Sequence, residues 1–327
     1  GAGCYGHNGA DDVGFDAALI ARALPGRPIL LKWTREEEHS WAPYATAMSL
    51  KLQASVDHDG KVMAWSHESY GDTFMMRPRS GPNMAGTARL LSSRFLENPP
   101  PKFTAGPTIA RHVGLHRNLD PLYSFPNKRL VKNLVRDLPL RTSALRTLGA
   151  FANVFALESF MDELAEAAGI DPFTFRLNHL DDPRGREVIE TLARHVDLTV
   201  DDGRGRGIGF AQYKNLKAYA AVYVELEVND AAEVVLHRAL LVGDAGEIVD
   251  RDGLTAQFDG GFLQAASWAI HEEVTWDRDG ITSRDWEGYP ILGFDNVPEI
   301  ETVLIERPGV PFLGAGEAVS GPTGAAI

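Results

Sequence analysis

A lone carboxylate, Glu317, lies near the end of the sequence in the segment Gly314-Ala315-Gly316-Glu317-Ala318. Glycine tolerates backbone angles that other residues avoid, and it lets a ligand approach the backbone closely. A carboxylate among small apolar residues is costly to ionise, which suits a general base. Acid–base chemistry beside a bulky ligand is therefore one interpretation of this segment. The other is a glycine turn and a glutamate that begins a small-residue helix packed in the core.

A second glycine-rich segment, Gly1-Ala2-Gly3-Cys4-Tyr5-Gly6, opens the sequence and fits the pattern G-x-G-x-x-G. A helix and a strand are expected after it, and Glu36 lies near the position of an acid that binds a ribose. These features indicate a Rossmann-type dinucleotide site. Tyr5, however, has a bulky side chain at a position where the backbone of such a site should contact pyrophosphate. Glu36 also lies somewhat further along the sequence than the ribose-binding acid of such a site. A Rossmann-type oxidoreductase stays open as an alternative.

Hydrophobic periodicity and turn residues predict the elements that must position these segments. The clearest amphipathic helix is 151–168, with Gly169 as its C-cap. The pair Asp59-Gly60 predicts a hairpin of 48–56 and 61–70. Residues 71–122 are irregular, and such long segments are usually functional. Further predictions are helices at 12–24, 172–180, 186–195 and 260–270, strands at 27–33, 128–135, 218–228 and 233–242, and a glycine-basic linker at 203–209.

The chain of 327 residues is longer than one hydrophobic core usually serves, so two parts are expected. Because the composition changes near Asp201, we place the parts at 1–200 and 201–327. We expect an α+β fold of strand-rich layers and packed helices. The chain begins with glycine and stops inside an expected helix, so we interpret it as part of a longer protein, incomplete at both ends.

Charge and cysteine content exclude several classes of function. The net charge is -13, from 32 basic and 45 acidic side chains, which argues against a nucleic-acid partner. No apolar run approaches the ~20 residues of a membrane helix. Cys4 is the only cysteine, so neither an internal disulfide nor a cysteine-ligated cluster is expected within this chain. The composition leaves the compartment open between bacterial cytoplasm and periplasm.

Four segments, in this order, together resemble a known family. They are GAGCYGHNG, LRTSALRTLGAFANVFALESFMDELA, GDAGEIVDRDGLTAQFDGGFLQAASWA and GAGEA. This set resembles the molybdopterin-binding subunit of the xanthine dehydrogenase and aldehyde oxidase family. It is most similar to the large subunits of the isoquinoline 1-oxidoreductase and nicotinate dehydrogenase type. The resemblance covers essentially the whole chain.

The resemblance implies a role for individual residues. Glu317 matches the catalytic glutamate of the family, and Arg146 matches an arginine that orients substrate. No direct protein ligand to molybdenum is implied. Purine-oxidising members have a carboxylate and an aromatic residue where this sequence has Asn8 and Leu148, which argues against a purine substrate. The cofactor-binding residues implied are Gly3, Cys4, Tyr5 and Gly6 of the opening loop, Gln257, which would bind the pterin, and Gly314 and Gly316.

The implied activity is that of a molybdenum-dependent hydroxylase or dehydrogenase. It would oxidise an N-heterocyclic or aldehyde substrate with water as the oxygen donor, and Glu317 would act as the base. The cofactor would be a molybdopterin-type molybdenum cofactor. Electrons would pass to [2Fe-2S] clusters in an iron–sulfur partner subunit. The family's other cofactor segments, including a Gly-Gln-Gly motif, have no counterpart here, so we expect the isolated fragment to be inactive. A non-catalytic fragment that cannot hold cofactor alone is the second alternative.

Overall fold

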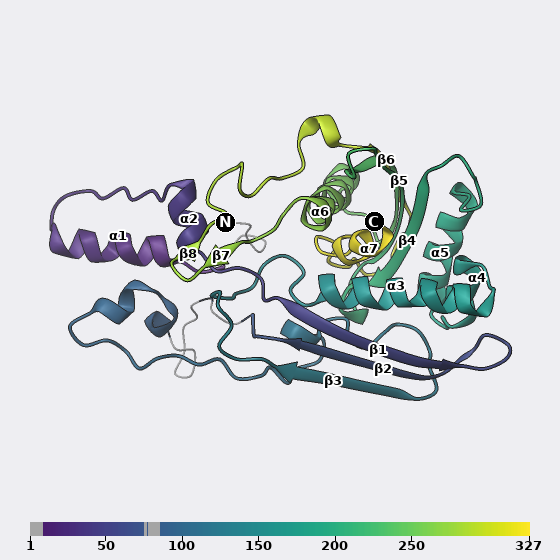
Figure 1. Ribbon diagram of the computed structural model, residues 1–327, viewed down its shortest axis with the longest axis horizontal. Coiled ribbons are helices and arrows are strands. Elements are labelled where there is room, and N and C mark those ends of the chain that lie inside the picture. The colour runs from purple at the N-terminus through teal and green to yellow at the C-terminus, as the bar shows by residue number, and fades with distance from the viewer. Residues whose placement is uncertain (1–8, 75–76, 78–85) are drawn as a thin grey trace.

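A computed structural model describes residues 9–74, 77 and 86–327. It has the expected α+β fold, with two main sheets and helices packed between and around them (Figure 1). The helices are α1 (Asp12–Ala23), α2 (Arg35–Trp41), α3 (Ala150–Ala168), α4 (Pro172–Asn178), α5 (Pro183–His195), α6 (Arg251–Ile270) and α7 (Ser320–Ala326). The strands are β1 (Met48–Val56), β2 (Val62–Gly71), β3 (Lys128–Leu134), β4 (Gly205–Gln212), β5 (Tyr219–Val228), β6 (Val234–Asp244), β7 (Trp276–Asp277), β8 (Gly280–Ile281) and β9 (Glu299–Leu304).

The first sheet has the strand order β1-β2-β3 and lies against α3 (Figure 1). The predicted hairpin is confirmed: β1 and β2 are antiparallel, and Gly60 in their turn has a φ of +79°, which favours glycine. β3 then pairs parallel to β2. Gly169 ends α3 in the left-handed region with a φ of 64°, as the sequence predicted.

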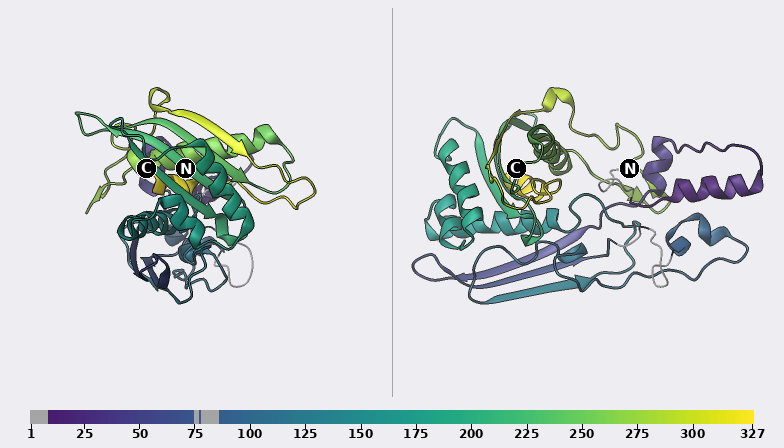
Figure 2. Two further views of the ribbon diagram at one scale, coloured as in Figure 1. Left: turned by 90° about the vertical axis from the view of Figure 1, so that its right-hand side faces the viewer. Right: turned by 180° about the vertical axis from the view of Figure 1, so that it is seen from behind.

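The second sheet has the order β4-β5-β6-β9. One face packs on α5, while α6 and α7 pack on the other face, inside the curve of the sheet (Figures 1 and 2). The strands predicted at 218–228 and 233–242 are confirmed as β5 and β6, which pair antiparallel. The pairing of β9 with β6 is parallel and brings the last part of the chain back to the sheet just before the Glu317 segment.

One hydrophobic cluster joins the two sheets. It includes Trp65 of β2, Met161 of α3, Val188 of α5 and Tyr223 of β5. A second cluster, around Phe258 and Phe262 of α6, fills the space between the second sheet and α7. The composition change at Asp201 falls between α5 and β4, but the first cluster crosses it. The division into domains 1–200 and 201–327 stays a prediction.

Two predictions of secondary structure are wrong, and the helix expected at 260–270 begins earlier, at Arg251. Residues 27–33 form no strand, and Leu30 is 95% exposed, so that apolar run has no sheet to enter. Residues 203–209 are not simply a linker, because β4 begins at Gly205. The glycines of β4 are needed for close packing: a Cβ at Gly207 or Gly209 would lie 2.2 or 2.3 Å from a backbone carbonyl oxygen of α7. Among the described residues, no helix is long and apolar enough to cross a bilayer.

Candidate functional site

The carboxylate of Glu317 contacts a segment far away in the sequence. Its Oε1 accepts the backbone N–H of Thr147 at 2.7 Å. The side chain of Glu317 is 18% exposed, so a small ligand can reach it without the carboxylate lying in bulk solvent. Glu317 stands at the turn that leads into α7, and Thr147 at the turn that leads into α3. The two helix starts therefore meet at this carboxylate.

A cation and a phenol lie beside the same carboxylate. Arg117 Nη1 is 3.8 Å from Glu317 Oε1, and it donates a hydrogen bond of 2.5 Å to Tyr213 Oη. Both side chains are buried, at 7% and 5% exposure. Although the sequence predicted an apolar neighbourhood for Glu317, the structure surrounds it with hydrogen-bond donors.

The loops that surround Glu317 have unusual backbone conformations. Thr147 and Leu148 have φ values of 70° and 53°, and Lys214 and Asn215 have 58° and 48°. Left-handed backbone is uncommon outside glycine, and it is a true outlier for a β-branched residue such as Thr147. Of the eight non-glycine residues with positive φ in the described part of the chain, six belong to segments 112–118, 147–148 and 214–215. Strain of this kind concentrates at functional sites.

Arg146 ties the Glu317 segment to α6. Its Nε donates to the carbonyl oxygen of Gly316 at 3.0 Å, and Nη2 donates to the same oxygen. Nη1 donates to Gln264 Oε1 at 2.9 Å, and Nη2 to the carbonyl oxygen of Gln257 at 3.4 Å. The guanidinium therefore orients the backbone next to Glu317, and its role toward substrate stays a prediction.

The structure describes some of the other predicted site residues and not others. The carbonyl oxygen of Gly314 accepts the N–H of Ala218, which fixes the segment to β5. Gln257 lies on α6 with an exposed side chain. Gly3, Cys4, Tyr5 and Gly6 lie outside the described residues. The carbonyl of Gly9 accepts a hydrogen bond from Ser143.

The sequence did not single out Arg117 and Tyr213. Arg117 lies in the long irregular segment 71–122, and the length of that segment was a signal that it could be functional. Tyr213 follows β4 in a three-residue turn, Tyr213–Asn215. No periodicity or motif marks it. Only the tertiary structure places these two side chains next to Glu317.

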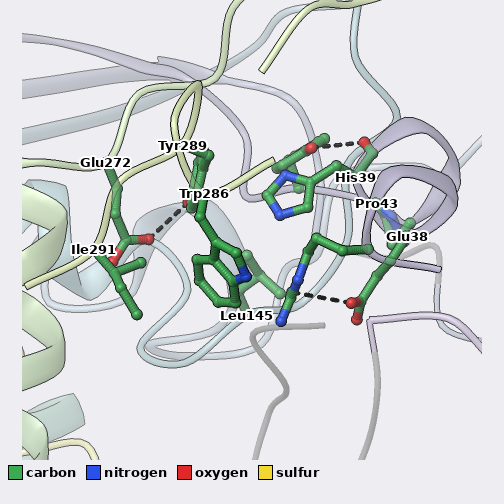
Figure 3. Close-up of a pocket in the computed structure, with 11 residues that line it drawn as sticks. Glu38, His39, Pro43, Leu145, Glu272, Trp286, Tyr289 and Ile291 are labelled. Carbon is green, nitrogen blue, oxygen red and sulfur yellow. Dashed lines mark hydrogen bonds and ion pairs between the residues drawn. The ribbon is translucent and has the colours of Figure 1, made fainter. Parts of the chain in front are cut away.

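A hollow of about 210 Å³ lies between α2 and residues 286–291 (Figure 3). His39 lines it, is 8% exposed and has no hydrogen-bond partner at Nδ1. Burial, helped by the charge of Arg35, lowers the pKa of His39. Tyr289 donates to Glu272 at 2.7 Å on the opposite wall. Neither Glu317 nor its described contacts line this hollow, so the two features are distinct.

Two donors beside Glu317 are already bound within the chain: the Thr147 N–H to Glu317 itself, and Arg117 Nη1 to the Tyr213 oxygen. The exposed side-chain amide of Gln257 on α6 suits a ligand rich in oxygen and nitrogen atoms, because an amide can both donate and accept hydrogen bonds. Within the described residues, no group of three or more His, Cys, Asp or Glu side chains could hold a metal ion.

Comparisons with known proteins agree with this geometry. Two families, each described as a molybdopterin cofactor-binding domain, match residues 73–180 and 161–298. A nicotinate dehydrogenase subunit of Pseudomonas putida is 35% identical over 100% of this chain and 27% of its own length. The beta subunit of isoquinoline 1-oxidoreductase from Brevundimonas diminuta is 27% identical over 91% of this chain and 36% of its own length. The chain thus spans about a third or less of these curated relatives.

Solved structures show the same fold. Quinoline 2-oxidoreductase of Pseudomonas putida 86 superposes with a TM-score of 0.69 at 14% identity, over 94% of this chain and 62% of that one. Carbon monoxide dehydrogenase of Oligotropha carboxidovorans gives a TM-score of 0.71 at 11% identity, over 96% and 61%. The two family matches together cover residues 73–298, which is more than half of the chain. The chain therefore belongs to the molybdopterin cofactor-binding family of the xanthine dehydrogenase and aldehyde oxidase type.

Proposed function

We propose that this chain is the part of a molybdenum hydroxylase large subunit that carries the catalytic base, and that Glu317 is that base. The observation that supports the proposal is the position of the Glu317 carboxylate. It is held by the Thr147 N–H where strained loops converge, and it is reachable from solvent. A carboxylate that only capped a helix would not need an arginine and a buried phenol beside it. Proton transfer by a positioned base contributes typically ~10²–10⁴-fold to a rate.

The residues of this chain would bind the cofactor, orient the catalytic carboxylate and accept one proton. When bound, the molybdenum cofactor supplies the two-electron redox chemistry and the activation of water-derived oxygen. Glu317 accepts the proton at its carboxylate. Arg146 holds the Gly316 carbonyl, and so sets the backbone from which Glu317 projects. Gln257, Gly314, Gly316 and the opening glycine loop, Gly3, Cys4, Tyr5 and Gly6, would hold the cofactor.

The substrate would be a small N-heterocycle or an aldehyde. Relatives of this chain carry the names nicotinate dehydrogenase, isoquinoline 1-oxidoreductase and aldehyde oxidoreductase. Leu148, two residues after Arg146, gives the site no aromatic surface at that position, which argues against a purine. Electrons would leave through the [2Fe-2S] clusters of a separate iron–sulfur subunit, since relatives are named as subunits of larger enzymes.

Substitution of Glu317 by glutamine in the complete enzyme tests the proposal. Glutamine keeps the size and most hydrogen bonding but cannot accept the proton. We expect turnover per bound molybdenum to fall by at least roughly 100-fold, with molybdenum content nearly unchanged. Glu317→Asp should also be slow, because the shorter side chain moves the base.

Glu225→Gln is the matched control, since that carboxylate is similarly covered, at 12% exposure, and is bound by Arg204. The Glu225→Gln enzyme should keep its turnover per bound molybdenum. Full activity of Glu317→Gln would eliminate Glu317 as the base. An enzyme that binds no molybdenum at all would instead support the non-catalytic alternative.

The dinucleotide alternative has lost its support. It needed a strand at residues 27–33, and those residues are irregular. Glu36, the expected ribose-binding acid, lies on α2 and pairs with Arg284 at 3.4 Å. We do not propose a dinucleotide site.

A further inference from the structure

We propose that Arg117 and Tyr213 are positioning residues that hold the Glu317 carboxylate: the Arg117 guanidinium pairs with the carboxylate, and the Tyr213 phenol fixes the guanidinium by accepting its hydrogen bond. This inference rests on the proposed function of Glu317 as a base. Arg117 Nη1 donates to Tyr213 Oη at 2.5 Å and lies 3.8 Å from Glu317 Oε1. Glu317 is thus held from two sides, by the Arg117 guanidinium and by the Thr147 N–H.

The direction of the hydrogen bond between Arg117 and Tyr213 follows from the protonation states of the two side chains. Burial raises the pKa of the Tyr213 phenol well above its usual value, and the nearby charge of Glu317 raises it further. Arg117 opposes this shift but does not reverse it. The phenol therefore keeps its proton, and its oxygen accepts the N–H of Arg117.

The pair is held rigidly by two asparagines. Asn153 of α3 donates through Nδ2 to the carbonyl oxygens of Leu115 and Arg117, both at 2.9 Å. Its Oδ1 accepts the hydroxyl of Ser69 on β2. Asn153 is fully buried, so the Arg117 loop is fixed to both α3 and the first sheet.

Asn118 joins that loop to the Tyr213 turn. Its Nδ2 donates to the carbonyl oxygen of Gln212 at 2.8 Å, and its Oδ1 accepts the N–H of Lys214 at 2.8 Å. Asn118 and Lys214 both have left-handed backbone, with φ of 59° and 58°. The fold thus maintains two strained conformations at the place where the phenol meets the guanidinium. Preorganised donors of this kind need no rearrangement during a proton transfer.

The groups that face Glu317 come from four segments. Arg117 and Tyr213 flank the carboxylate itself. Arg146 lies on the adjacent Gly316 carbonyl, and Lys214 has its Nζ 5.5 Å from the centre of the Tyr213 ring. From α6, the neutral side chain of Gln264 contacts Arg146. The charged side chains among these described residues, Arg117, Arg146 and Lys214, are all cations.

Two kinetic consequences distinguish positioning from a purely structural role. Loss of the phenol hydroxyl should free the Arg117 guanidinium and let the Glu317 carboxylate leave its productive position, which lowers kcat. KM should change little, because neither side chain is proposed to contact substrate.

The experiment compares Tyr213→Phe with Tyr123→Phe in the complete enzyme. Tyr123 is a matched control, because its hydroxyl is also buried and lies in a cluster of a carboxylate and an arginine: it donates to Glu158 at 2.9 Å, and Arg176 binds the same carboxylate. For Tyr213→Phe we expect kcat per bound molybdenum to fall roughly tenfold with KM nearly unchanged. Tyr123→Phe should lower the melting temperature and leave kcat per bound molybdenum unchanged.

A second readout needs no turnover. Deuterium uptake by the peptide that covers residues 145–150 reports on the Thr147 N–H, which Glu317 accepts. Uptake should rise in Tyr213→Phe and not in Tyr123→Phe. In a Glu317→Gln background, Tyr213→Phe should cause no further loss of kcat, because the two changes affect one proton transfer.

The outcomes separate the two proposals. If Glu317→Gln is inactive while Tyr213→Phe changes neither kcat nor the deuterium uptake, the positioning role is overturned and the base assignment stands. An equal fall of kcat in Tyr123→Phe overturns the positioning role as well. If Glu317→Gln retains full activity, the proposed function itself fails, and this inference fails with it.

Discussion

The packing of α7 on β4 makes Gly209→Ala the most informative single substitution. An added Cβ would lie 2.3 Å from the carbonyl oxygen of Pro322 and 3.0 Å from that residue's carbonyl carbon. The closest ordinary contacts between carbon and a carbonyl oxygen are about 3.3 Å, so the two elements must separate by roughly 1 Å. Because the obstructing atoms belong to the backbone, no side-chain rotation can relieve the clash.

The magnitude follows from this displacement. Overpacking a core costs about 1–3 kcal/mol, and a clash with backbone belongs at the upper end. Glu317 stands just before α7, so a shift of the helix moves its carboxylate. Its 2.7 Å hydrogen bond from Thr147 would stretch past the limit of about 3.2 Å. A misplacement of roughly 1 Å can lower a rate by about 100-fold. We therefore expect both stability and turnover to fall.

Gly205→Ala on the same strand is the control. The closest contact of its Cβ would be the end of the Leu226 side chain at 3.3 Å, which can rotate away, and the Leu226 carbonyl oxygen at 3.7 Å lies at an ordinary van der Waals distance. The assay is the urea midpoint of the complete enzyme, together with hydrogen exchange in the peptide that covers residues 320–326 and turnover per bound molybdenum. If Gly209→Ala matches Gly205→Ala in all three measurements, the reasoning about close packing is refuted.

Two further predictions concern buried charges. Arg176 and Glu158 form a buried ion pair at 2.9 Å. Arg176→Met should lower the free energy of unfolding by about 3–5 kcal/mol in a urea titration, because it leaves the buried Glu158 carboxylate without its cation. Burial lowers the pKa of His67 to about 4, whereas an unfolded histidine titrates near 6.5. The unfolded state then binds more protons between these values, so stability should fall by up to about 3 kcal/mol as the pH drops from about 6.5 to 4. His67→Leu should remove this pH dependence, whereas the exposed His58→Gln should not; equal pH dependence in His67→Leu and the unsubstituted enzyme would contradict the assignment.

Local signals in the sequence predicted much of the fold. The periodicity of α3, the left-handed Gly169 that ends it and the Asp59-Gly60 turn between β1 and β2 all lie within a few residues of the structure they specify. The strand prediction at 27–33 failed because an apolar run forms a strand only where a neighbouring strand accepts its hydrogen bonds. The linker prediction at 203–209 failed because glycine signals a loop locally. Here the glycines of β4 instead admit α7.

The sequence alone also determined the family and singled out Glu317, because a glycine-flanked carboxylate and four ordered segments can be read without coordinates. Only the tertiary structure decided what surrounds that carboxylate. Thr147 and Glu317 are separated by 170 positions, and Arg117 and Tyr213 by 96. Contacts over such separations leave no periodicity in the sequence. They arise because α3 and α7 pack together and because buried asparagines hold the loops in conformations that their own residues would not adopt.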